Sequence, residues 1–397
     1  TAALGLLILV VVSTAGTTCG QAFSATPTNL EPTGPGPADQ RLDPDPDSGL
    51  GRPAWALQDT TSTGGAALID VGSWTAFVSP KEISRIDPDG TVAWTRTGHD
   101  TRVIPMGDDR LGHALGIDDT VHLAVMDADG GLVRCDRLAA RIGDMVGDGS
   151  GGYLTVDLDS TGDRQAAVLR RVEADGSQRW RRELGPGSGE SIPNLFVGDG
   201  IAAVGLFLPA GGPDQPVLMA FDDRNGQPIW TRDGTTDIER VERTLGLLDD
   251  TLYLVAIDPS LEDGARERLA AVDAGTGDTR WVVPLPGDDV RAAQIVAGPS
   301  RPLIVGADSV TAIETDSGRV RWRVTADPSL DIAQGVWPSQ PIEDGDRVIQ
   351  PLAGGGAMVD LADGTWTPMV SAEERNRLDG LAIDGDVLLA SVTLLDR

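Results

Sequence analysis

A short pattern of hydrophobic and polar positions recurs along the chain. Each copy consists of an apolar run, an acidic residue, two or three turn-forming residues, a glycine, three further residues and a tryptophan. The clearest copies span residues 218–230, 269–281 and 310–322. Self-similarity at a period of about 40 to 50 residues is typical of solenoids and propellers.

The acidic, glycine and tryptophan positions define the motif in every copy. Complete copies are Asp222, Gly226, Trp230; Asp273, Gly277, Trp281; Glu314, Gly318, Trp322; and, one residue shorter, Asp87, Gly90, Trp94 and Glu173, Gly176, Trp180. A further copy with the same spacing, Asp47, Gly51, Trp55, lies near the N-terminus. Two copies are degenerate, because Arg134 takes the tryptophan position and Trp366 follows Gly364 by only two residues.

This unit predicts a β-hairpin. Alternation such as Val310-Thr-Ala-Ile puts every second side chain on one face of a sheet. The acidic residue can accept hydrogen bonds from turn amides, and glycine supplies the positive φ of a tight connection. The tryptophan then begins the next strand, where its large ring would fill an equivalent gap between neighbouring sheets in each repeat.

Further strand candidates lie between the hairpins, for example at residues 201–207, 251–257 and 302–306, so each repeat holds about four strands. The one helix candidate, residues 371–378, is short. Four-stranded sheets at this period predict an all-β propeller, a fold that usually has about 4 to 8 blades. We expect eight blades over residues 47–397, closed by an N-terminal strand that completes a C-terminal blade; seven blades is the alternative.

The Asp-x-x-x-Gly-x-x-x-Trp unit resembles the repeat of the PQQ-type β-propellers, a superfamily that includes quinoprotein alcohol dehydrogenases and BamB-like lipoproteins. For the dehydrogenases, the resemblance implies a Ca²⁺-bound quinone stacked on a ring formed by two adjacent cysteines. This chain has neither a Cys-Cys pair nor a Cys-x-x-Cys-His motif. The resemblance therefore favours the BamB-like branch, with no bound cofactor.

The N-terminal segment indicates export. Residues 2–12 are apolar and are followed by Cys19, and residues 20–46 are rich in Pro, Thr and Gly. We interpret residues 1–19 as a signal or membrane-anchor segment and residues 20–46 as a flexible tether. Three readings stay open for the first segment: a cleaved secretory signal, a lipoprotein signal with lipid attachment at Cys19, or part of a membrane anchor. Cys19 could instead be a free or disulfide-bonded thiol, and only Cys135 could pair with it within the chain.

Charge limits the partners. With 32 Lys and Arg against 61 Asp and Glu, the net charge is −29, and the basic residues are spread along the chain. This balance argues against a nucleic-acid partner, which needs a track of basic side chains.

No catalytic, cofactor-binding or metal-ligating residue emerges from the remaining motifs. The glycine-rich segment 147–152 matches a dinucleotide-binding pattern, but a strand rather than a helix follows it, which predicts a hairpin loop. Prolines break the calcium-like series of residues 43–47. The histidines His99, His113 and His122 have weak spacing for zinc.

These observations predict a non-enzymatic extracytoplasmic propeller, membrane-tethered or secreted, that binds an exported or membrane protein as a scaffold or accessory subunit. The alternative is a PQQ- and calcium-dependent quinoprotein, or a propeller that binds a small ligand in its central channel. Because propellers host many functions, the fold alone does not decide between the two.

Overall fold

The computed structural model describes the chain from the N-terminal strand at residue 30 to residue 394, with gaps. The described residues are 30–32, 42–44, 57–59, 67–79, 82–87, 89, 91–97, 103–117, 120–138, 142–161, 164–186, 194–205, 216–233, 240–257, 267–284, 294–298, 301–305, 309–325, 342–344, 347–352, 355–360, 364–372, 376–384 and 387–394. Strands, turns and bends account for these ranges, and they contain no helix. Within them, accordingly, no helix has the length and apolarity to cross a membrane.

Six sheets of four antiparallel strands follow one another in chain order. The first is β4(Ala67–Asp70), β5(Thr75–Val78), β6(Glu82–Ile86), β7(Val92–Thr97); the second is β8(Val103–Gly107), β9(Arg110–Ile117), β10(Thr120–Met126), β11(Leu132–Arg137); the third is β12(Ile142–Gly147), β13(Tyr153–Thr161), β14(Arg164–Val172), β15(Gln178–Pro186). The fourth is β16(Asn194–Gly198), β17(Ile201–Gly205), β18(Pro216–Asp222), β19(Pro228–Asp233); the fifth is β20(Arg240–Leu248), β21(Thr251–Ile257), β22(Glu267–Asp273), β23(Thr279–Pro284); the sixth is β24(Gln294–Gly298), β25(Arg301–Val305), β26(Ser309–Ile313), β27(Val320–Thr325).

A seventh sheet has five strands. It consists of β28(Ile342–Asp344), β29(Arg347–Leu352), β30(Gly355–Asp360), β31(Trp366–Ala372) and, on the outer edge beside β31, the N-terminal strand β2(Leu42–Pro44). Two strand pairs complete the described set, β1(Leu30–Pro32) with β3(Leu57–Asp59) and β32(Asn376–Asp384) with β33(Val387–Leu394).

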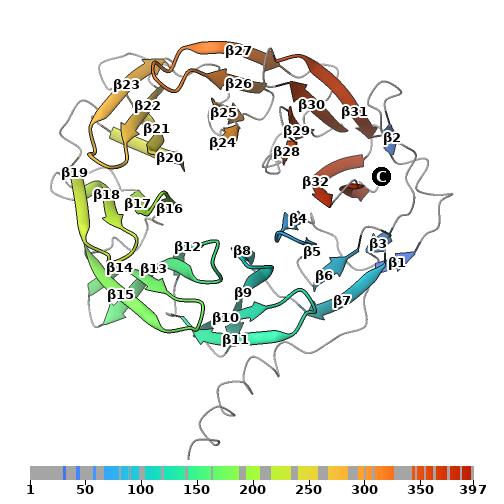
Figure 1. Ribbon diagram of the computed structural model, residues 1–397, viewed down its shortest axis with the longest axis horizontal. Helices are drawn as coiled ribbons and strands as arrows, with labels where there is room; N and C mark the ends of the chain where they lie inside the picture. The colour runs from blue at the N-terminus through green and yellow to red at the C-terminus, as the bar shows by residue number, and fades with distance from the viewer. Residues whose placement is uncertain are drawn as a thin grey trace, which may run out of the picture.

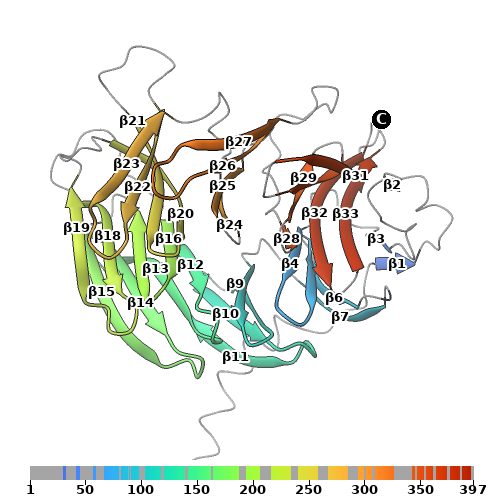
Figure 2. The same ribbon diagram turned by 45° about the horizontal axis from the view of Figure 1, so that its top comes forward.

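The sheets are arranged around a ring in the order of the sequence (Figure 1). The first strand of each sheet lies toward the centre and the last strand forms the rim. The pair β32–β33 lies between the seventh sheet and β4 of the first, so the two ends of the series meet (Figures 1 and 2). This is the all-β propeller that the repeat predicts.

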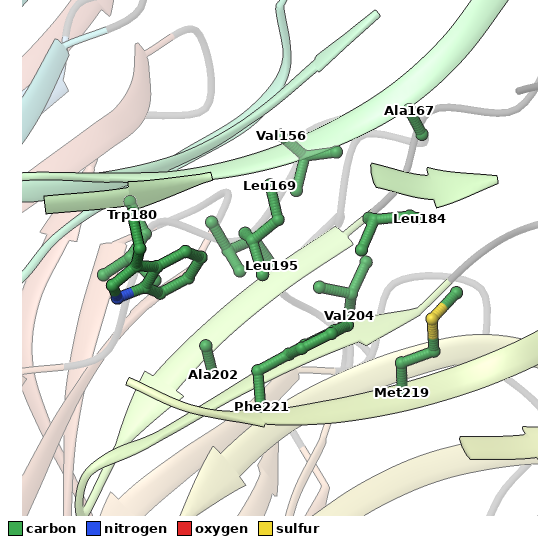
Figure 3. Close-up of a cluster of buried hydrophobic side chains, with 11 residues drawn as sticks. Val156, Ala167, Leu169, Trp180, Leu184, Leu195, Ala202, Val204, Met219 and Phe221 are labelled. Atoms are coloured by element: carbon green, nitrogen blue, oxygen red, sulfur yellow. The ribbon is translucent and has the colours of Figure 1, made fainter. Parts of the chain in front are cut away.

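The hydrophobic core is divided among the interfaces between successive sheets. Each of the five interfaces among the first six sheets holds its own cluster, because side chains on the two faces of a sheet alternate and pack against the sheets before and after it. Figure 3 shows the cluster between the third and fourth sheets, where Leu169 and Trp180 meet Leu195, Val204 and Phe221.

The sequence analysis also predicted which N-terminal strand closes the propeller and how many blades it has. The N-terminal strand that joins a C-terminal sheet is β2, within the range predicted as a tether, whereas β3, just after Trp55, pairs with β1. The number of blades remains a prediction, since β32 and β33 form a sheet of only two strands among the described residues.

Two local expectations were wrong. The helix candidate at residues 371–378 instead supplies the end of β31 and the beginning of β32, because strand pairing overrides a weak local helical preference. In the complete copies that the structure describes, the tryptophan is the third residue of its strand, as in β19, which starts at Pro228; in the degenerate copy, Trp366 does begin β31.

The glycine-rich segment 147–152 is a hairpin connection, as predicted, and it also joins two sheets. Gly151 N donates to Met106 O of β8 (2.8 Å), and Ser150 forms a β-bridge with Gly107. A Cβ atom on Gly147 would lie 2.1 Å from Pro105 O and 2.8 Å from Met106 Cα. Only glycine permits this backbone contact between the second and third sheets.

We therefore expect Gly147→Ala to lower the melting temperature much more than Gly198→Ala. Both glycines end the innermost strand of a sheet, but a Cβ on Gly198 would meet only the Leu247 side chain at an ordinary 3.5 Å. Because the obstacle at Gly147 is backbone, the alanine variant must separate the two sheets or distort them. Equal shifts in thermal unfolding would contradict this role of the loop.

Candidate functional site

The rim of the ring repeats one contact between neighbouring sheets. A tryptophan on the last strand of one sheet lies over the turn glycine of the next sheet, and its indole N–H donates to a carbonyl in the same turn. The ring–glycine pairs are Trp94 with Gly130, Trp180 with Gly226, Trp230 with Gly277, Trp281 with Gly318 and Trp322 with Gly364. The described acceptors are Ala128 O (2.8 Å), Asp223 O (2.8 Å), Ala274 O (2.7 Å) and Thr315 O (2.7 Å), for the first four tryptophans in that order.

Two features of this contact require glycine: the positive φ of the turn and the close approach of the tryptophan ring. Gly226, for example, has φ +66°, and a Cβ there would lie 2.6 Å from the Trp180 ring. The repeated spacing of glycine and tryptophan is thus explained by a lock between sheets, which we call the tryptophan lock.

An arginine two residues after the tryptophan reinforces the lock in three sheets. Arg96 Nη2, Arg182 Nε and Arg232 Nη1 donate to the carbonyl oxygen of the same turn glycine, at 2.6, 2.6 and 3.2 Å. The sequence carries a signal for these arginines, since each follows its tryptophan as Trp-x-Arg, just beyond the Asp-x-x-x-Gly-x-x-x-Trp unit.

Arg134 occupies the tryptophan position of the second sheet and, like the indole N–H groups, donates hydrogen bonds to the turn of the next sheet. Its Nη1 donates to Glu173 O (2.8 Å) and to Ala174 O in the turn of the third sheet, and its Nε pairs with Asp136 at 2.8 Å. Burial raises the pKa of Asp136, although the Arg134 guanidinium acts in the opposite direction. This sheet therefore replaces a ring by a partly buried ion pair.

The turns that carry the locks lie on one face of the ring. In a sheet of four antiparallel strands, the first and third connections emerge at the same end, and backbone bonds join them: Asp223 N donates to Gly200 O and Ala274 N to Asp250 O. Successive sheets are joined there as well, since Trp74 Nε1 donates to Asp109 O (3.1 Å). We call this surface the turn face.

The turn face is strongly acidic. Its exposed carboxylates are Asp89, Asp108, Asp129, Asp175, Asp199, Asp249, Asp250, Asp278, Glu314 and Asp316. Its exposed guanidinium groups are fewer: Arg224 and Arg319 in the described turns, and Arg179 and Arg280 on the adjoining strands, where they pair with Glu173 and with Asp250 and Asp273. Negative charge is thus spread over the turns of the first six sheets.

Local hydrogen bonds explain why many turns begin with an acidic residue. Asp127 Oδ1 accepts from Asp129 N (3.1 Å) and Gly131 N (2.7 Å), and Asp222 and Asp273 make comparable contacts in their own turns. Such bonds stabilise the ionised form: the Thr91 amide lowers the pKa of Asp89, and Arg280 lowers that of Asp250. These groups stay negative well into the acidic range.

One buried ion network links the third and fourth sheets beneath this face. Arg171 donates to Asp148 Oδ2 (2.7 Å) and to both oxygens of Asp223 (2.6 and 2.8 Å). The Asp148 side chain is only 2% exposed. Burial raises the pKa of Asp223, and Arg171 opposes that shift.

The remaining predicted residues fall into two groups. Cys19, Asp47, Gly51, Trp55, Gly90 and His99 lie outside the described residues. His113 is fully buried in β9, and His122 Nδ1 lies 3.8 Å from Cys135 Sγ on the neighbouring strand. Throughout the described ranges, no group of three or more His, Cys, Asp or Glu side chains is placed to hold a metal ion.

Comparison with known proteins places this architecture in a family. The model of the family described as "Outer membrane protein assembly factor BamB" matches residues 164–307 and 214–387, which together exceed half of the chain. This chain belongs to that family of PQQ-repeat propellers.

Two solved structures share the propeller fold with this family member. BamB from Moraxella catarrhalis has a TM-score of 0.50 at 16% identity, covering 82% of this chain and 95% of that one. Apo AztD from Citrobacter koseri has a TM-score of 0.53 at 12% identity, covering 80% and 88%.

A curated relative matches over a shorter stretch. Quinohemoprotein alcohol dehydrogenase ADH-IIG from Pseudomonas putida is 27% identical over 170 residues, which covers 36% of this chain and 22% of the relative. The matched part of this BamB-family chain thus corresponds to less than a quarter of that dehydrogenase.

If the tryptophan lock holds the sheets together, Trp281→Ala should cost about 3–5 kcal/mol in the free energy of unfolding, through lost packing and a cavity. The matched control is Val282→Ala, whose side chain is 39% exposed on the same strand and should change stability by about 0.5 kcal/mol or less. Urea unfolding measures both. Similar midpoints for the two variants would contradict the lock.

The replacement of tryptophan by Arg134 in the second sheet can be tested by restoring the Trp-x-Arg pattern of the other sheets. Arg134→Trp alone leaves Asp136 half-buried without its guanidinium, which should cost about 1–3 kcal/mol. Adding Asp136→Arg recreates the Trp-x-Arg sequence and should recover most of that loss. A double variant whose destabilisation equals the sum of the two single changes would show that the positions are not equivalent to the other locks.

Proposed function

We propose that this chain is a non-enzymatic, extracytoplasmic propeller that binds an exported or membrane protein, as a scaffold or accessory subunit of an envelope assembly. The observation that carries the proposal is the match to the BamB family over more than half of the chain. The proposed location has its own support in the apolar segment at residues 2–12 and in Cys135, which is disulfide-bonded, because disulfides persist mainly outside the cytosol.

The turn face is the surface that we assign to the partner. Short turns, fixed by backbone bonds and by the tryptophan locks, hold its carboxylates in place, so little conformational entropy is lost on binding. Its charge fits a partner with a basic surface. Attraction between such surfaces raises the association rate and is weakened by salt.

Asparagine substitutions test this assignment without disturbing the turns. Asp108, Asp199 and Asp249 have positive φ values of about 50°, a conformation that asparagine also tolerates. In cross-linking and affinity purification from native membranes, we expect the triple variant Asp108→Asn, Asp199→Asn, Asp249→Asn to recover about tenfold less partner than the unmodified protein, or less still.

The control variant is Glu183→Gln, which removes an exposed charge from the rim strand β15 rather than from the turn face. It should recover the partner as the unmodified protein does. Full recovery by the triple variant at low salt would exclude the turn face as the binding surface. Failure of every form to capture a specific partner would contradict the scaffold function itself.

The identity with part of a quinohemoprotein alcohol dehydrogenase favours one second candidate, a quinone-dependent enzyme. The sequence lacks the adjacent cysteine pair that the resemblance to the dehydrogenases would require. We therefore expect no thermal shift and no dye-linked alcohol oxidation when the protein is incubated with PQQ and Ca²⁺. A ligand at 100 times its dissociation constant would stabilise the protein by about 2.7 kcal/mol, so saturable binding would be visible and would favour the enzyme.

A further inference from the structure

The outer strand of each of the first six sheets carries a β-bulge. In each case one residue of the outer strand has no counterpart on the neighbouring strand, and this residue comes just before the tryptophan position. The extra residues are Ala93, Val133, Arg179, Ile229, Arg280 and Arg321. Bulges twist an edge strand and limit its pairing with another chain. The outer edge is therefore regular only over the residues that follow each bulge.

The seventh sheet shows that such a regular edge can bind a further strand. Its outer strand β31 has its bulge at Met369, and β2 pairs antiparallel with the residues that follow, with Leu42 opposite Ala372 and Asp43 opposite Ser371. In Figure 1, β2 lies on the outer side of β31. The fold thus contains one example of a strand from a distant part of the chain that is added to the outer edge of a sheet.

Charge distinguishes β23 from the other outer strands of the first six sheets. In those five strands the stretch after the bulge contains an arginine: Arg96, Arg134, Arg181, Arg232 and Arg323. Charged residues on an edge strand protect it against strand addition. In β23 this stretch, residues 281–284, is uncharged, and Val282 is 39% exposed. Arg280, at the bulge itself, is held by Asp250 and Asp273 at 2.6 Å each, so its charge is balanced on the turn face.

The backbone of Val282 is oriented to pair with an added strand. Proline occurs in a sheet where its nitrogen faces away from the neighbouring strand, because it has no N–H to donate. Pro284 lies opposite Arg268 of β22, so its nitrogen faces the outer edge. Since these directions alternate along a strand, the N–H and C=O of Val282 also face the outer edge. Among the described strands, none pairs with β23 on this side.

The position of Val282 matches that of the residue that receives β2. Val282 is the second residue after the bulge at Arg280, and Ser371 is the second residue after the bulge at Met369. The edge of β23 therefore offers the same register that β31 offers to Asp43, with an exposed valine in place of the serine.

We propose that the outer edge of β23 binds an extended segment of a partner protein by antiparallel strand addition, as β31 binds β2. The added strand runs toward the turn face, because β23 begins there at Thr279. Its C-terminal end meets the exposed Asp278, so a basic residue suits that end, whereas a β-branched residue suits the position opposite Val282. The inference does not rest on the proposed function, because a peptide rather than the native partner tests it.

A second copy of this chain fits the edge less well than such a segment. Each chain carries a net charge of −29, which opposes the approach of two copies. Pairing of two stretches as short as residues 281–284 also buries far less than the roughly 1,200–2,000 Å² of a stable protein interface. An extended segment needs only the edge itself.

Peptide binding to the purified full-length chain tests the proposal. The probe is a capped, fluorescently labelled peptide of alternating valine and threonine with a C-terminal lysine. We expect saturable binding by fluorescence anisotropy and slower hydrogen exchange of the Val282 amide in the bound form. The amide of Arg181, which holds the equivalent position on the charged β15 edge, should exchange at an unchanged rate.

Matched variants at one position separate backbone pairing from contact with the side chain. Val282→Pro removes the outward N–H and should weaken peptide binding about tenfold or more, since a tenfold change corresponds to the loss of a single good hydrogen bond. Val282→Thr keeps the N–H and a β-branched side chain and should bind as the unmodified protein does. Thermal unfolding shows whether both variants fold. A peptide N-methylated on the nitrogens that face β23 needs no protein variant and should not bind.

Four outcomes would overturn the proposal. They are the absence of saturable binding, equal affinity of Val282→Pro and Val282→Thr, undiminished binding of the N-methylated peptide, and equal protection of the Val282 and Arg181 amides. A dimer in light scattering that Val282→Pro dissociates would also overturn it, because the second copy would then be the occupant of the edge.

Discussion

The contact between a tryptophan ring and a turn glycine of the next sheet is the interaction on which the ring depends. Each sheet alone is a four-stranded ribbon with two apolar faces, and it becomes stable only when both faces are covered by its neighbours. The tryptophan lock fixes the position of the next sheet. The indole ring fits only above a residue that lacks a side chain, and the indole N–H reaches only a carbonyl of that turn.

The same turns determine the surface of the molecule. An acidic residue is needed to close the turn, and every repeat brings one to the same end of the ring. The charge of the turn face is therefore partly a consequence of how the hairpins fold. The locks and the buried Asp148–Arg171–Asp223 network hold neighbouring turns at fixed spacing, and this rigidity supports the partner binding that we propose for the turn face.

Short-range features could be predicted from the sequence, and long-range contacts could not. The hairpins, the positive φ at Gly226 and the placement of tryptophan between sheets follow from spacing and side-chain shape. The contact of Gly147 with Pro105 depends on how two separate sheets approach, and no local pattern records it. At Arg134 the sequence shows only that the tryptophan is absent. The structure was needed to show that the Arg134 guanidinium reaches a carbonyl of the next turn. The addition of β2 to the seventh sheet joins segments more than 300 residues apart, for which the sequence offered no register.

The central claim is that the tryptophan locks make the successive sheets unfold as one unit. Native-state hydrogen exchange tests it most directly, because it reports the opening free energy of each hairpin separately. If the locks couple the sheets, the amides of the locked hairpins β18–β19, β22–β23 and β26–β27 should exchange with nearly the same free energy, close to that of global unfolding. If one of these hairpins exchanged several kcal/mol more easily than its neighbours, the locks would not couple the sheets.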